Sequence, residues 1–307
     1  MTKIFIDGSA GTTGLRIYER LEGRDDISLI KLPDELRKDA AARKEAINSA
    51  DIVFLCLPDD AAREAVSFIE NKNTAVIDTS TAHRVNPDWA YGFPEISGNR
   101  EKIASSKLIA NPGCHASGFI ALVAPLVEAG VISRDIALSC FSLTGYSGGG
   151  KKMIAEYEAD DVSELYKAPR QYGLTQLHKH LPEMQAVTGI SALPIFCPIV
   201  ADFYSGMEVT VPISAGDIKA DINAICDIYK GYYNSGLVHF CSDAAESGFL
   251  SAAAFSGRDD MQLTVCGNNE RIILVARYDN LGKGASGSAI QNMNILMGVD
   301  EKTGLII

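Results

Sequence analysis

Short apolar runs alternate with helix-forming stretches through the first 110 residues of the chain. The runs cover residues 3–7, 27–31, 51–58, 74–80 and 107–110. The segments between them carry polar residues and good helix formers over about 10–15 positions. Strands that alternate with helices of this length predict a parallel sheet with helices on both faces, and uninterrupted apolar runs suit strands buried on both sides. The pattern therefore predicts a Rossmann-like α/β domain.

The pattern changes after Gly130. Five longer apolar runs follow, namely DIALSCFSL, ALPIFCPIV, MEVTVPIS, QLTVCG and RIILVARY. Only two clear helices separate them, at about 150–165 and 217–233. Consecutive strands with few helices predict a second, α+β domain with a mostly antiparallel sheet. At the end of the chain, Ala289, Ile290 and Met293 fall on one face of a final helix, which could pack back on the first domain.

Composition and charge exclude some classes of partner. The chain has 307 residues and a formal net charge of −11, whereas nucleic acids and anionic membranes require a basic surface. The opening MTKIFIDGSAG lacks the pattern of a signal peptide. No apolar run approaches the ~20 residues of a membrane span. We expect a cytoplasmic protein that acts on small molecules.

A glycine-rich loop follows the first predicted strand and opens the first predicted helix. It reads Gly8-Ser-Ala-Gly11-Thr-Thr-Gly14. In this position, backbone amides and a helix N-terminus can face the pyrophosphate of a dinucleotide. The spacing is GxxGxxG and not the usual GxGxxG, so a plain strand-turn-helix remains the alternative.

The residues after the second predicted strand bear on the choice between NAD and NADP. An acidic residue there would bind the ribose 2′-hydroxyl of NAD. Instead the strand ends at Lys31, and Arg37 lies nearby, so a cation could meet the 2′-phosphate of NADP. Asp34 and Glu35 also lie close by, which leaves NAD open.

Cys114 differs from the other cysteines. Seven cysteines, an odd and scattered set without a CxxC pair, do not form a disulfide framework. Most of the others lie in apolar runs and fit buried positions. Cys114 instead follows Asn-Pro-Gly at the threshold of a predicted helix, where unpaired amides and the helix dipole lower a thiol pKa. We expect a nucleophile at the carboxyl edge of the parallel sheet, with a buried structural cysteine as the alternative.

A cysteine nucleophile usually needs a base, and the chain has five histidines. His178 and His180 occur together in LHKHLPEM, where a strand would turn both to one face. No local carboxylate or thiol completes a metal site around them, so no metal is expected. His83 and His115 are possible bases too, whereas His239 fits a solvated surface position.

A second glycine-rich stretch, Gly145 to Lys152, matches GxxxxGK of the nucleotide phosphate loop. Lys152 stands where that loop carries the Ser or Thr that binds Mg²⁺, so the match fails there. The loop could still hold a substrate anion, and Arg84 in DTSTAHR is a second candidate anion ligand. Solvated surface cations are the alternative for both.

Taken in order, several motifs resemble the N-acetyl-γ-glutamyl-phosphate reductases of arginine biosynthesis. They are GSAGTTG, CLPDDAA, DTSTAHR, YGFPE, NPGC, GYSGGGKKMI, HKHLPE and NLGKGASGSAIQNMN, and the resemblance covers about residues 4–298. It implies a dinucleotide-binding domain over 1–113 completed by residues 284–307. It also implies a catalytic and oligomerisation domain over 114–283, and a dimer or tetramer.

The resemblance also implies a reaction and roles for residues. The reaction is the reversible, NADPH-dependent reduction of an acyl phosphate through a thioester on Cys114. A histidine of the HKH motif would be the base; we prefer His180, with His178 orienting the substrate, and the reverse order is the alternative. The remaining candidates divide between two ligands. For the cofactor they are Gly8, Ser9, Gly11, Thr12, Thr13, Gly14, Lys31, Arg37, Asn280 and Lys283. For the substrate they are Arg84, Ser147, Gly148, Gly149 and Lys151.

Other functions remain open on the sequence. A carrier-linked aminoadipyl-phosphate reductase and an aspartyl-phosphate semialdehyde dehydrogenase would use the same chemistry. A phosphate-loop nucleotide hydrolase would need Mg²⁺ and ignore alkylation of Cys114. A non-catalytic nucleotide sensor would bind NADP without a reactive thiol.

Overall fold

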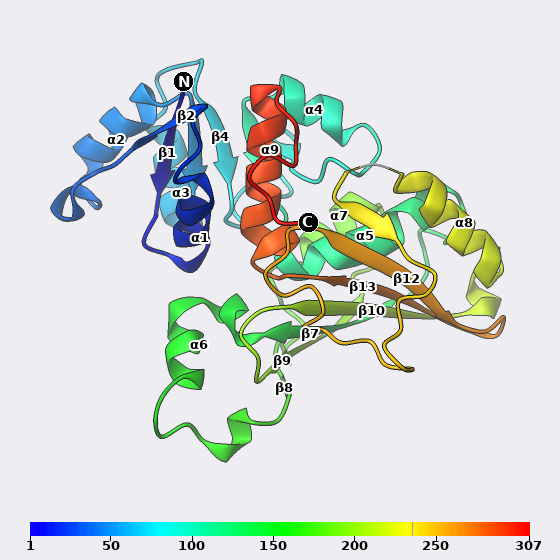
Figure 1. Ribbon diagram of the computed structural model, residues 1–307. Helices are drawn as coiled ribbons and strands as arrows, with labels where there is room; N and C mark the ends of the chain where they lie inside the picture. The colour runs from blue at the N-terminus through cyan, green and yellow to red at the C-terminus, as the bar shows by residue number, and fades with distance from the viewer. Residues whose placement is uncertain (235) are drawn as a thin grey trace. The chain divides into compact units, whose positions relative to one another are not determined.

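The computed structural model describes residues 1–234 and 236–307 and divides the chain into two compact units (Figure 1). Unit 1 comprises residues 1–113 and 285–305, and unit 2 comprises residues 114–284 and 306–307. No helix in these described ranges is both long and apolar enough to cross a membrane.

Unit 1 is a parallel sheet with helices on both faces, as the alternating pattern predicts. The sheet order is β2-β1-β3-β4-β6-β5, and every pair is parallel. The strands are β1 (Thr2–Asp7), β2 (Ile27–Ile30), β3 (Ile52–Leu55), β4 (Ala75–Asp78), β5 (Ala90–Tyr91) and β6 (Leu108–Ala110). The helices are α1 (Thr12–Leu21), α2 (Ala40–Ser49), α3 (Asp59–Ser67), α4 (Asn99–Ser105) and α9 (Gly287–Met297).

Side chains alternate between two cores, one on each face of this sheet. Ile4 and Ile6 of β1 point into a core shared with α1, α4 and α9. Phe5, between them, points into the opposite core, which is shared with α2 and α3. Helix α9, which comes from the far end of the sequence, contributes Ala289, Ile290 and Met293 to the first core. Burial on both faces explains why these strands read as uninterrupted apolar runs.

Unit 2 is a seven-stranded, mostly antiparallel sheet in the order β11-β12-β13-β10-β7-β9-β8. Only the pairs β11–β12 and β7–β9 are parallel. The strands are β7 (Ser139–Gly145), β8 (Arg170–Gln171), β9 (Ile195–Ala201), β10 (Met207–Ser214), β11 (Val238–Phe240), β12 (Met261–Gly267) and β13 (Arg271–Tyr278). The helices are α5 (Cys114–Glu128), α6 (Gly150–Tyr157), α7 (Leu181–Thr188) and α8 (Ile222–Tyr232), with a π-helical turn at Gly282–Ser286.

The predicted fold class is confirmed, with differences in detail. The helix expected over about 150–165 ends at Tyr157. Helix α7 is two turns long and follows His180 directly, at a place where no helix was predicted. Helices α5 and α8 pack against β10, β12 and β13, and α7 packs against α5. One face of the unit 2 sheet is thereby covered.

Candidate active site

The glycine loop of unit 1 is shaped for a close approach between backbone segments. Gly8 has φ +88°, and a Cβ there would lie 2.2 Å from the Cys56 carbonyl oxygen. A Cβ on Gly14 would lie 2.5 Å from the Gly8 carbonyl oxygen. Between them, the Gly11 amide donates to the Gly8 carbonyl at 2.9 Å. Glycine at these positions is therefore needed to form the turn itself.

The start of α1 can receive an anion. Its N-cap is Gly11, which supplies no side-chain cap, and its first turn carries no acidic residue. The Thr12 hydroxyl is buried and has no hydrogen-bond partner within the part of the chain that the structure describes. Ser9 and Thr13, both partly buried, flank it. Uncapped amides, the positive end of a helix dipole and an unsatisfied hydroxyl fit the pyrophosphate of a dinucleotide.

The two cations predicted to meet a 2′-phosphate already face carboxylates. The Lys31 ammonium lies 4.7 Å from the centre of the Tyr18 ring and 3.8 Å from a Glu22 oxygen. Arg37 pairs with Asp34 in the same short loop. Both cations are substantially exposed at the carboxyl end of the edge strand β2. Their partners are surface carboxylates, so a phosphate could replace them at small cost.

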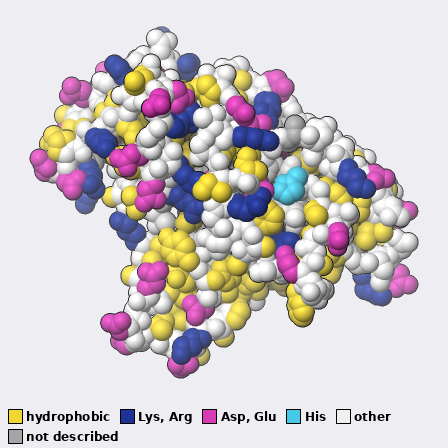
Figure 2. All heavy atoms as spheres, viewed as in Figure 1, with side chains coloured by type: hydrophobic (Ala, Val, Ile, Leu, Met, Phe, Trp, Pro, Cys, Tyr) yellow, Lys and Arg dark blue, Asp and Glu magenta, His cyan; other side chains and the backbone are white. Residues whose placement is uncertain are grey.

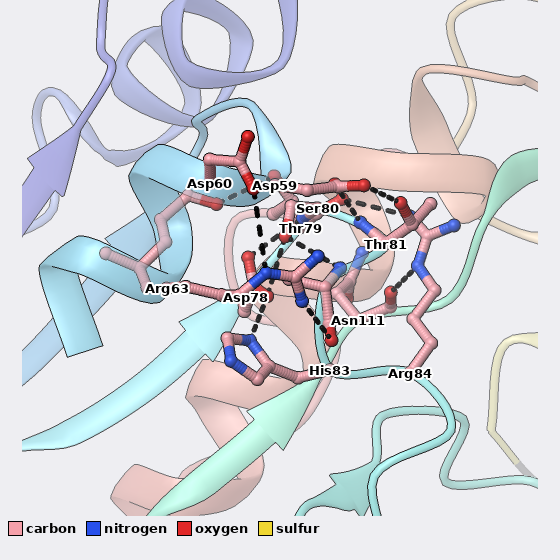
Figure 3. A network of polar contacts seen from close by, with 12 residues as sticks. Asp59, Asp60, Arg63, Asp78, Thr79, Ser80, Thr81, His83, Arg84 and Asn111 are labelled. Carbon is pink, nitrogen blue, oxygen red and sulfur yellow. Dashed lines mark hydrogen bonds and ion pairs between the residues drawn. The ribbon is translucent and has the colours of Figure 1, made fainter. Parts of the chain in front are cut away.

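Arg84 belongs to a polar network at the carboxyl ends of β4 and β6 (Figure 3). Its Nε donates to the Asn111 carbonyl at 2.9 Å, and its Nη2 donates to the Thr79 carbonyl at 2.9 Å. It is 9% exposed, so the alternative of a solvated surface cation is wrong. The guanidinium ties the loops after these two strands together.

The same network holds the His83 side chain in place, which indicates a structural role for this histidine. Its Nδ1 lies 2.7 Å from a carboxylate oxygen of the fully buried Asp78 (Figure 3). Its ring stacks on Trp89 with centroids 4.0 Å apart and planes 9° apart. The Ser80 hydroxyl donates to the same Asp78 carboxylate. These contacts hold the loop after β4 that carries Arg84.

In unit 2, Cys114 is the first residue of α5 and is partly buried. The Tyr278 hydroxyl donates to the Cys114 carbonyl at 2.5 Å and accepts from the Gly118 amide at 3.1 Å. These two bonds clamp the first turn of the helix. A Cβ on Gly284 would lie 3.1 Å from the Cys114 Cβ, so the π-helical turn packs tightly against the cysteine and favours glycine there. Cys114 thus stands at the positive end of the dipole of α5.

Three histidine rings form a group that includes His115, the residue that follows Cys114. The His115 ring lies 5.7 Å from the His178 ring and 5.5 Å from the His180 ring, and those two are 4.8 Å apart, centroid to centroid. Phe196 of β9 packs against His115 at 5.3 Å and against His178 at 5.1 Å. The sequence predicted that His178 and His180 would act together, and the structure brings them together with His115.

The two histidines of the HKH motif lie in a turn and not on a strand. The His180 amide donates to the His178 Nδ1 at 3.2 Å, so in neutral His178 the proton sits on Nε2. His180 is 5% exposed and is the N-cap residue of α7. No group of three or more His, Cys, Asp or Glu residues that could hold a metal occurs among the described residues.

His115 is held by hydrogen bonds at both ring nitrogens. Its Nδ1 lies 2.6 Å from the Ser142 hydroxyl and its Nε2 lies 2.6 Å from the Tyr172 hydroxyl. Burial, and then the neighbouring His178, lower the pKa of His115 from 6.5 to about 3, so the ring is neutral. Burial, and then the negative charge of the Cys114 thiolate, raise the pKa of Tyr172, so its hydroxyl keeps its proton.

The loop that resembles a phosphate loop is connected to the segment after β13. The Ser147 hydroxyl accepts a hydrogen bond from the Asn280 Nδ2 at 3.0 Å, and the Asn280 Oδ1 accepts from the Gly206 amide at 2.9 Å. Ser147 is 1% exposed. A Cβ on Gly148 would lie 3.4 Å from Asn280 Nδ2. Ser147, predicted to bind the substrate, and Asn280, predicted to bind the cofactor, therefore lie in contact.

The remaining candidates of this region differ in exposure. Lys151, at the start of α6, is exposed, whereas Lys283 in the π-helical turn is fully buried. Gly149 precedes α6, and a Cβ there would lie 2.5 Å from Met153. The two candidate lysines of this region thus lie on separate elements, one exposed and one buried.

Sequence reasoning missed three residues of this region. Tyr172 lies in a loop without a motif, and Tyr278 reads as an ordinary core aromatic at the end of a strand. Glu183, 1% exposed, lies in the first turn of α7. Of the three, only Glu183 could have been predicted from the sequence, because it belongs to the HKHLPE motif and stands three residues after His180.

The Rossmann-like unit and the glycine loop define a class of protein, the dinucleotide-dependent enzymes, and the candidate site holds a cysteine at a helix start and a group of histidine rings. Comparison with known proteins agrees. Residues 31–106 match the family model "Semialdehyde dehydrogenase, NAD binding domain", and residues 114–280 match "Semialdehyde dehydrogenase, dimerisation domain".

Curated relatives narrow the class. The N-acetyl-γ-glutamyl-phosphate reductase 2 of Nostoc sp. is 43% identical, over 99% of this chain and 99% of the relative. The N-acetyl-γ-glutamyl-phosphate reductase of Burkholderia lata is 44% identical over 96% of each. The chain belongs to the N-acetyl-γ-glutamyl-phosphate reductases within the semialdehyde dehydrogenase family. The nucleotide-hydrolase alternative is therefore wrong.

Solved structures support the fold. An aspartate semialdehyde dehydrogenase II from Vibrio cholerae superposes with a TM-score of 0.73 at 16% identity, over 97% of this chain and 98% of that chain. An aspartate semialdehyde dehydrogenase from Francisella tularensis gives a TM-score of 0.71 at 14% identity, over 97% and 100%. The α/β class with a Rossmann-like domain is thus shared with these enzymes.

Proposed function

We propose that this chain catalyses the reversible, NADPH-dependent reduction of N-acetyl-L-glutamyl 5-phosphate to N-acetyl-L-glutamate 5-semialdehyde and phosphate, a step of arginine biosynthesis. The observation that carries the proposal is that Cys114 is the first residue of α5 and is followed directly by His115, whose ring is grouped with the rings of His178 and His180. Membership in the reductase family supports the substrate.

The covalent step follows from the chemistry of the thiol. The Cys114 sulfur attacks the acyl carbon, a C–S bond forms, and the C–O bond to the phosphate group breaks, so phosphate leaves with the electron pair. NADPH, when bound, supplies a hydride to the resulting thioester carbon. The oxyanion that this addition leaves takes up the proton that the base removed from the thiol. As the C–S bond breaks, the thiohemiacetal oxygen returns that proton to the base, the aldehyde is released and the sulfur leaves as the thiolate.

The histidines manage the protons of this sequence. We assign His180 as the base that takes the proton from the thiol and from the thiohemiacetal oxygen. His178, whose Nδ1 is occupied by the His180 amide, presents Nε2–H as a donor and would orient the substrate. The fixed tautomer of His178 supports this division of roles.

The other candidate residues remain assigned as the sequence suggested. The glycine loop, with Ser9, Thr12 and Thr13, would hold the pyrophosphate. Lys31 and Arg37 would hold the 2′-phosphate. Arg84 and the loop from Ser147 to Lys151 would receive the anionic groups of the substrate, and Asn280 and Lys283 would close the nicotinamide side. We propose the two compact units as the cofactor domain and the catalytic domain.

We also propose that copies of the chain associate through the open face of the unit 2 sheet. Phe141, Ile195 and Ile273 are 44%, 61% and 39% exposed, and all three point away from α5. Hydrophobic side chains gather over the lobe that carries α6 and β8 (Figure 2). Exposed apolar side chains on a sheet favour a second copy of this chain as the covering surface, and the family's dimerisation domain lies here. Phe141→Asp with Ile273→Asp should lower the mass in sedimentation equilibrium; an unchanged mass would refute this interface.

The proposed thiolate chemistry requires a reduced cysteine. All seven cysteines carry free thiols. A reducing compartment therefore suits the enzyme, and we propose the cytoplasm.

The function is tested in the reverse direction, by NADPH absorbance. Enzyme, NADP and N-acetylglutamate semialdehyde should form NADPH only when phosphate is present, and Cys114→Ser should form none. Cys140→Ser, a fully buried thiol on β7, is the matched control and should retain turnover. Phosphate-dependent turnover with aspartate semialdehyde and none with the acetylated substrate would move the assignment to the aspartyl enzyme.

A further inference from the structure

The segment from Tyr172 to His178 carries two side chains that lie against His115. The Tyr172 hydroxyl is 2.6 Å from the His115 Nε2, and the His178 ring is 5.7 Å from the His115 ring. Between these two residues, Leu174 and Leu177 are 74% and 85% exposed. Exposed leucines contribute little burial energy, so polar contacts must hold this segment in place.

A side-chain amide takes the place of a strand in this segment. The Tyr172 amide donates to the Pro198 carbonyl at 3.0 Å, which continues the pairing of β8 with β9. The chain then turns away, and the Gln176 side chain pairs with β9 instead. Its Nε2 donates to the Phe196 carbonyl at 2.7 Å, and its Oε1 accepts from the Phe196 amide at 2.9 Å. A carboxamide has the donor and the acceptor of a peptide group, so it reproduces one step of an antiparallel ladder.

The backbone at Gln176 adopts an unfavourable conformation while it makes this bridge. Its φ is +56°, in the left-handed region that a residue other than glycine enters at a cost in free energy. In the part of the chain that the structure describes, Ser247 is the one other such residue. A conformation of this kind persists where surrounding contacts determine it. At Gln176 they are the two bonds to Phe196 and the bond from its own amide to the Gly173 carbonyl at 3.0 Å.

The bridge reaches the histidines through Phe196, which is 1% exposed. The Phe196 ring lies 5.1 Å from the His178 ring and 5.3 Å from the His115 ring. Gln176 therefore holds the backbone of the residue whose buried ring packs against both histidines. His178 also follows Gln176 by two residues, and its Nδ1 accepts from the His180 amide within the same turn.

We propose that Gln176 is a positioning residue: its carboxamide bridge to Phe196 holds the turn that leads to His178 and thereby fixes the orientation of the His178 ring. The catalytic meaning of this role rests on the proposed function, in which His178 orients the substrate. The role itself concerns the shape of the turn, which can be observed without any substrate.

Two substitutions remove the bridge in different ways. Gln176→Glu keeps the acceptor for the Phe196 amide and loses the donor for the Phe196 carbonyl, whereas Gln176→Asn is one methylene too short for both bonds. Asparagine tolerates the left-handed region, so its effect does not come from strain. Gln176 is exposed, so neither variant disturbs the core. At about pH 8, each should lower kcat/KM for N-acetylglutamate semialdehyde about tenfold, a factor equal to the loss of one hydrogen bond, with KM for NADP unchanged.

The pH dependence of Gln176→Glu identifies the lost donor. A protonated carboxyl can donate its O–H to the Phe196 carbonyl, so protonation restores the bond. That bond favours the neutral form and raises the pKa of the introduced carboxyl above ~4.3. From about pH 8 to about pH 5, the kcat/KM of Gln176→Glu relative to the wild type should therefore rise at least about threefold. The same ratio for Gln176→Asn should stay constant. A constant ratio for Gln176→Glu would overturn the proposal.

Gln185→Glu is the matched control. The Gln185 Nε2, on α7, also donates to a backbone carbonyl, that of Ser191 at 2.7 Å. Gln185→Glu should keep the wild-type kcat/KM at every pH. A loss as large as that of Gln176→Glu would contradict a specific role for Gln176.

Nitrogen-15 NMR of the histidine rings tests the turn without substrate. His178 should give the signals of the Nε2–H tautomer, because its Nδ1 accepts from the His180 amide, and His178→Asn identifies these signals by their loss. Gln176→Asn should move them toward the average of the two tautomers, and Gln185→Glu should not. If the wild type lacks turnover with the acetylated substrate but the signals move in Gln176→Asn, the substrate assignment fails and the positioning role stands. Signals that stay in place in Gln176→Asn refute the positioning role, whatever the turnover.

Discussion

The buried, neutral state of His115 makes the stability of the protein depend on pH. In the unfolded chain the ring has a pKa near ~6.5, whereas burial and His178 lower its pKa to about 3 in the fold. Between these values the unfolded state binds one proton more than the folded state. The free energy of unfolding therefore falls as the pH drops through 6.5, by up to about 1.4 kcal/mol per pH unit.

The contribution of His115 to the free energy of unfolding can be isolated by comparing the wild type with His115 variants at each pH. Between about pH 6.5 and 4.5 this one group should lower the free energy of unfolding by roughly 2–3 kcal/mol. His115→Gln and His115→Phe remove the titration but differ in packing and hydrogen bonding. On acidification, we expect the free energy of unfolding to fall less in both variants than in the wild type. Its slope against pH should change by the same amount in the two variants. Titrating groups that do not interact with His115 cancel in the difference.

The assay is urea denaturation followed by circular dichroism at three pH values in this range. The single tryptophan, Trp89, lies in unit 1 and supplies a separate fluorescence signal. A stability difference between wild type and both variants that stays constant from pH 6.5 to 4.5 would refute the reasoning. His115 would then titrate alike in the folded and unfolded states.

Two further predictions concern the cofactor loop and the 2′-phosphate. Gly8→Ala should lower stability by more than about 1 kcal/mol and abolish NADPH binding measured by nicotinamide fluorescence, because its Cβ would overlap the Cys56 carbonyl. Gly98→Ala, also at positive φ but with nothing within 4 Å, is the control and should bind NADPH normally. Replacing Lys31 and Arg37 together by glutamine should weaken NADPH binding at least tenfold and leave NADH unchanged, since each contact to a phosphate is charge-assisted. Equal weakening of both dinucleotides would contradict the 2′-phosphate assignment.

The spacing of apolar residues predicted the fold best in segments where burial determines which positions are apolar. The strands of unit 1 are covered on both faces, so each appears as an apolar run with clear ends. Helix α7 was missed because its two turns bury only part of one side, and Pro182 in its first turn reads as a breaker. The two-residue strand β5 is too short to show a period.

Local motifs predicted some residues of the site, but they did not predict which distant residues the fold brings together. Cys114 and the two histidines of the HKH motif could be predicted because a helix start, a glycine turn and a pair of histidines are each encoded in a few consecutive residues. Ser142, Tyr172 and Tyr278 come from separate strands and loops, and only the pairing of β7, β9, β10 and β13 brings them to α5. No spacing rule contains that information.

The central claim is that Cys114 carries the acyl group as a thioester, and intact-protein mass spectrometry tests it most directly. Enzyme mixed with N-acetylglutamate semialdehyde and NADP, without phosphate, should form one equivalent of NADPH and gain the mass of the acyl group. Peptide mapping should place that mass on Cys114, and added phosphate should remove it. An unmodified Cys114 in an enzyme that still turns over would contradict the account.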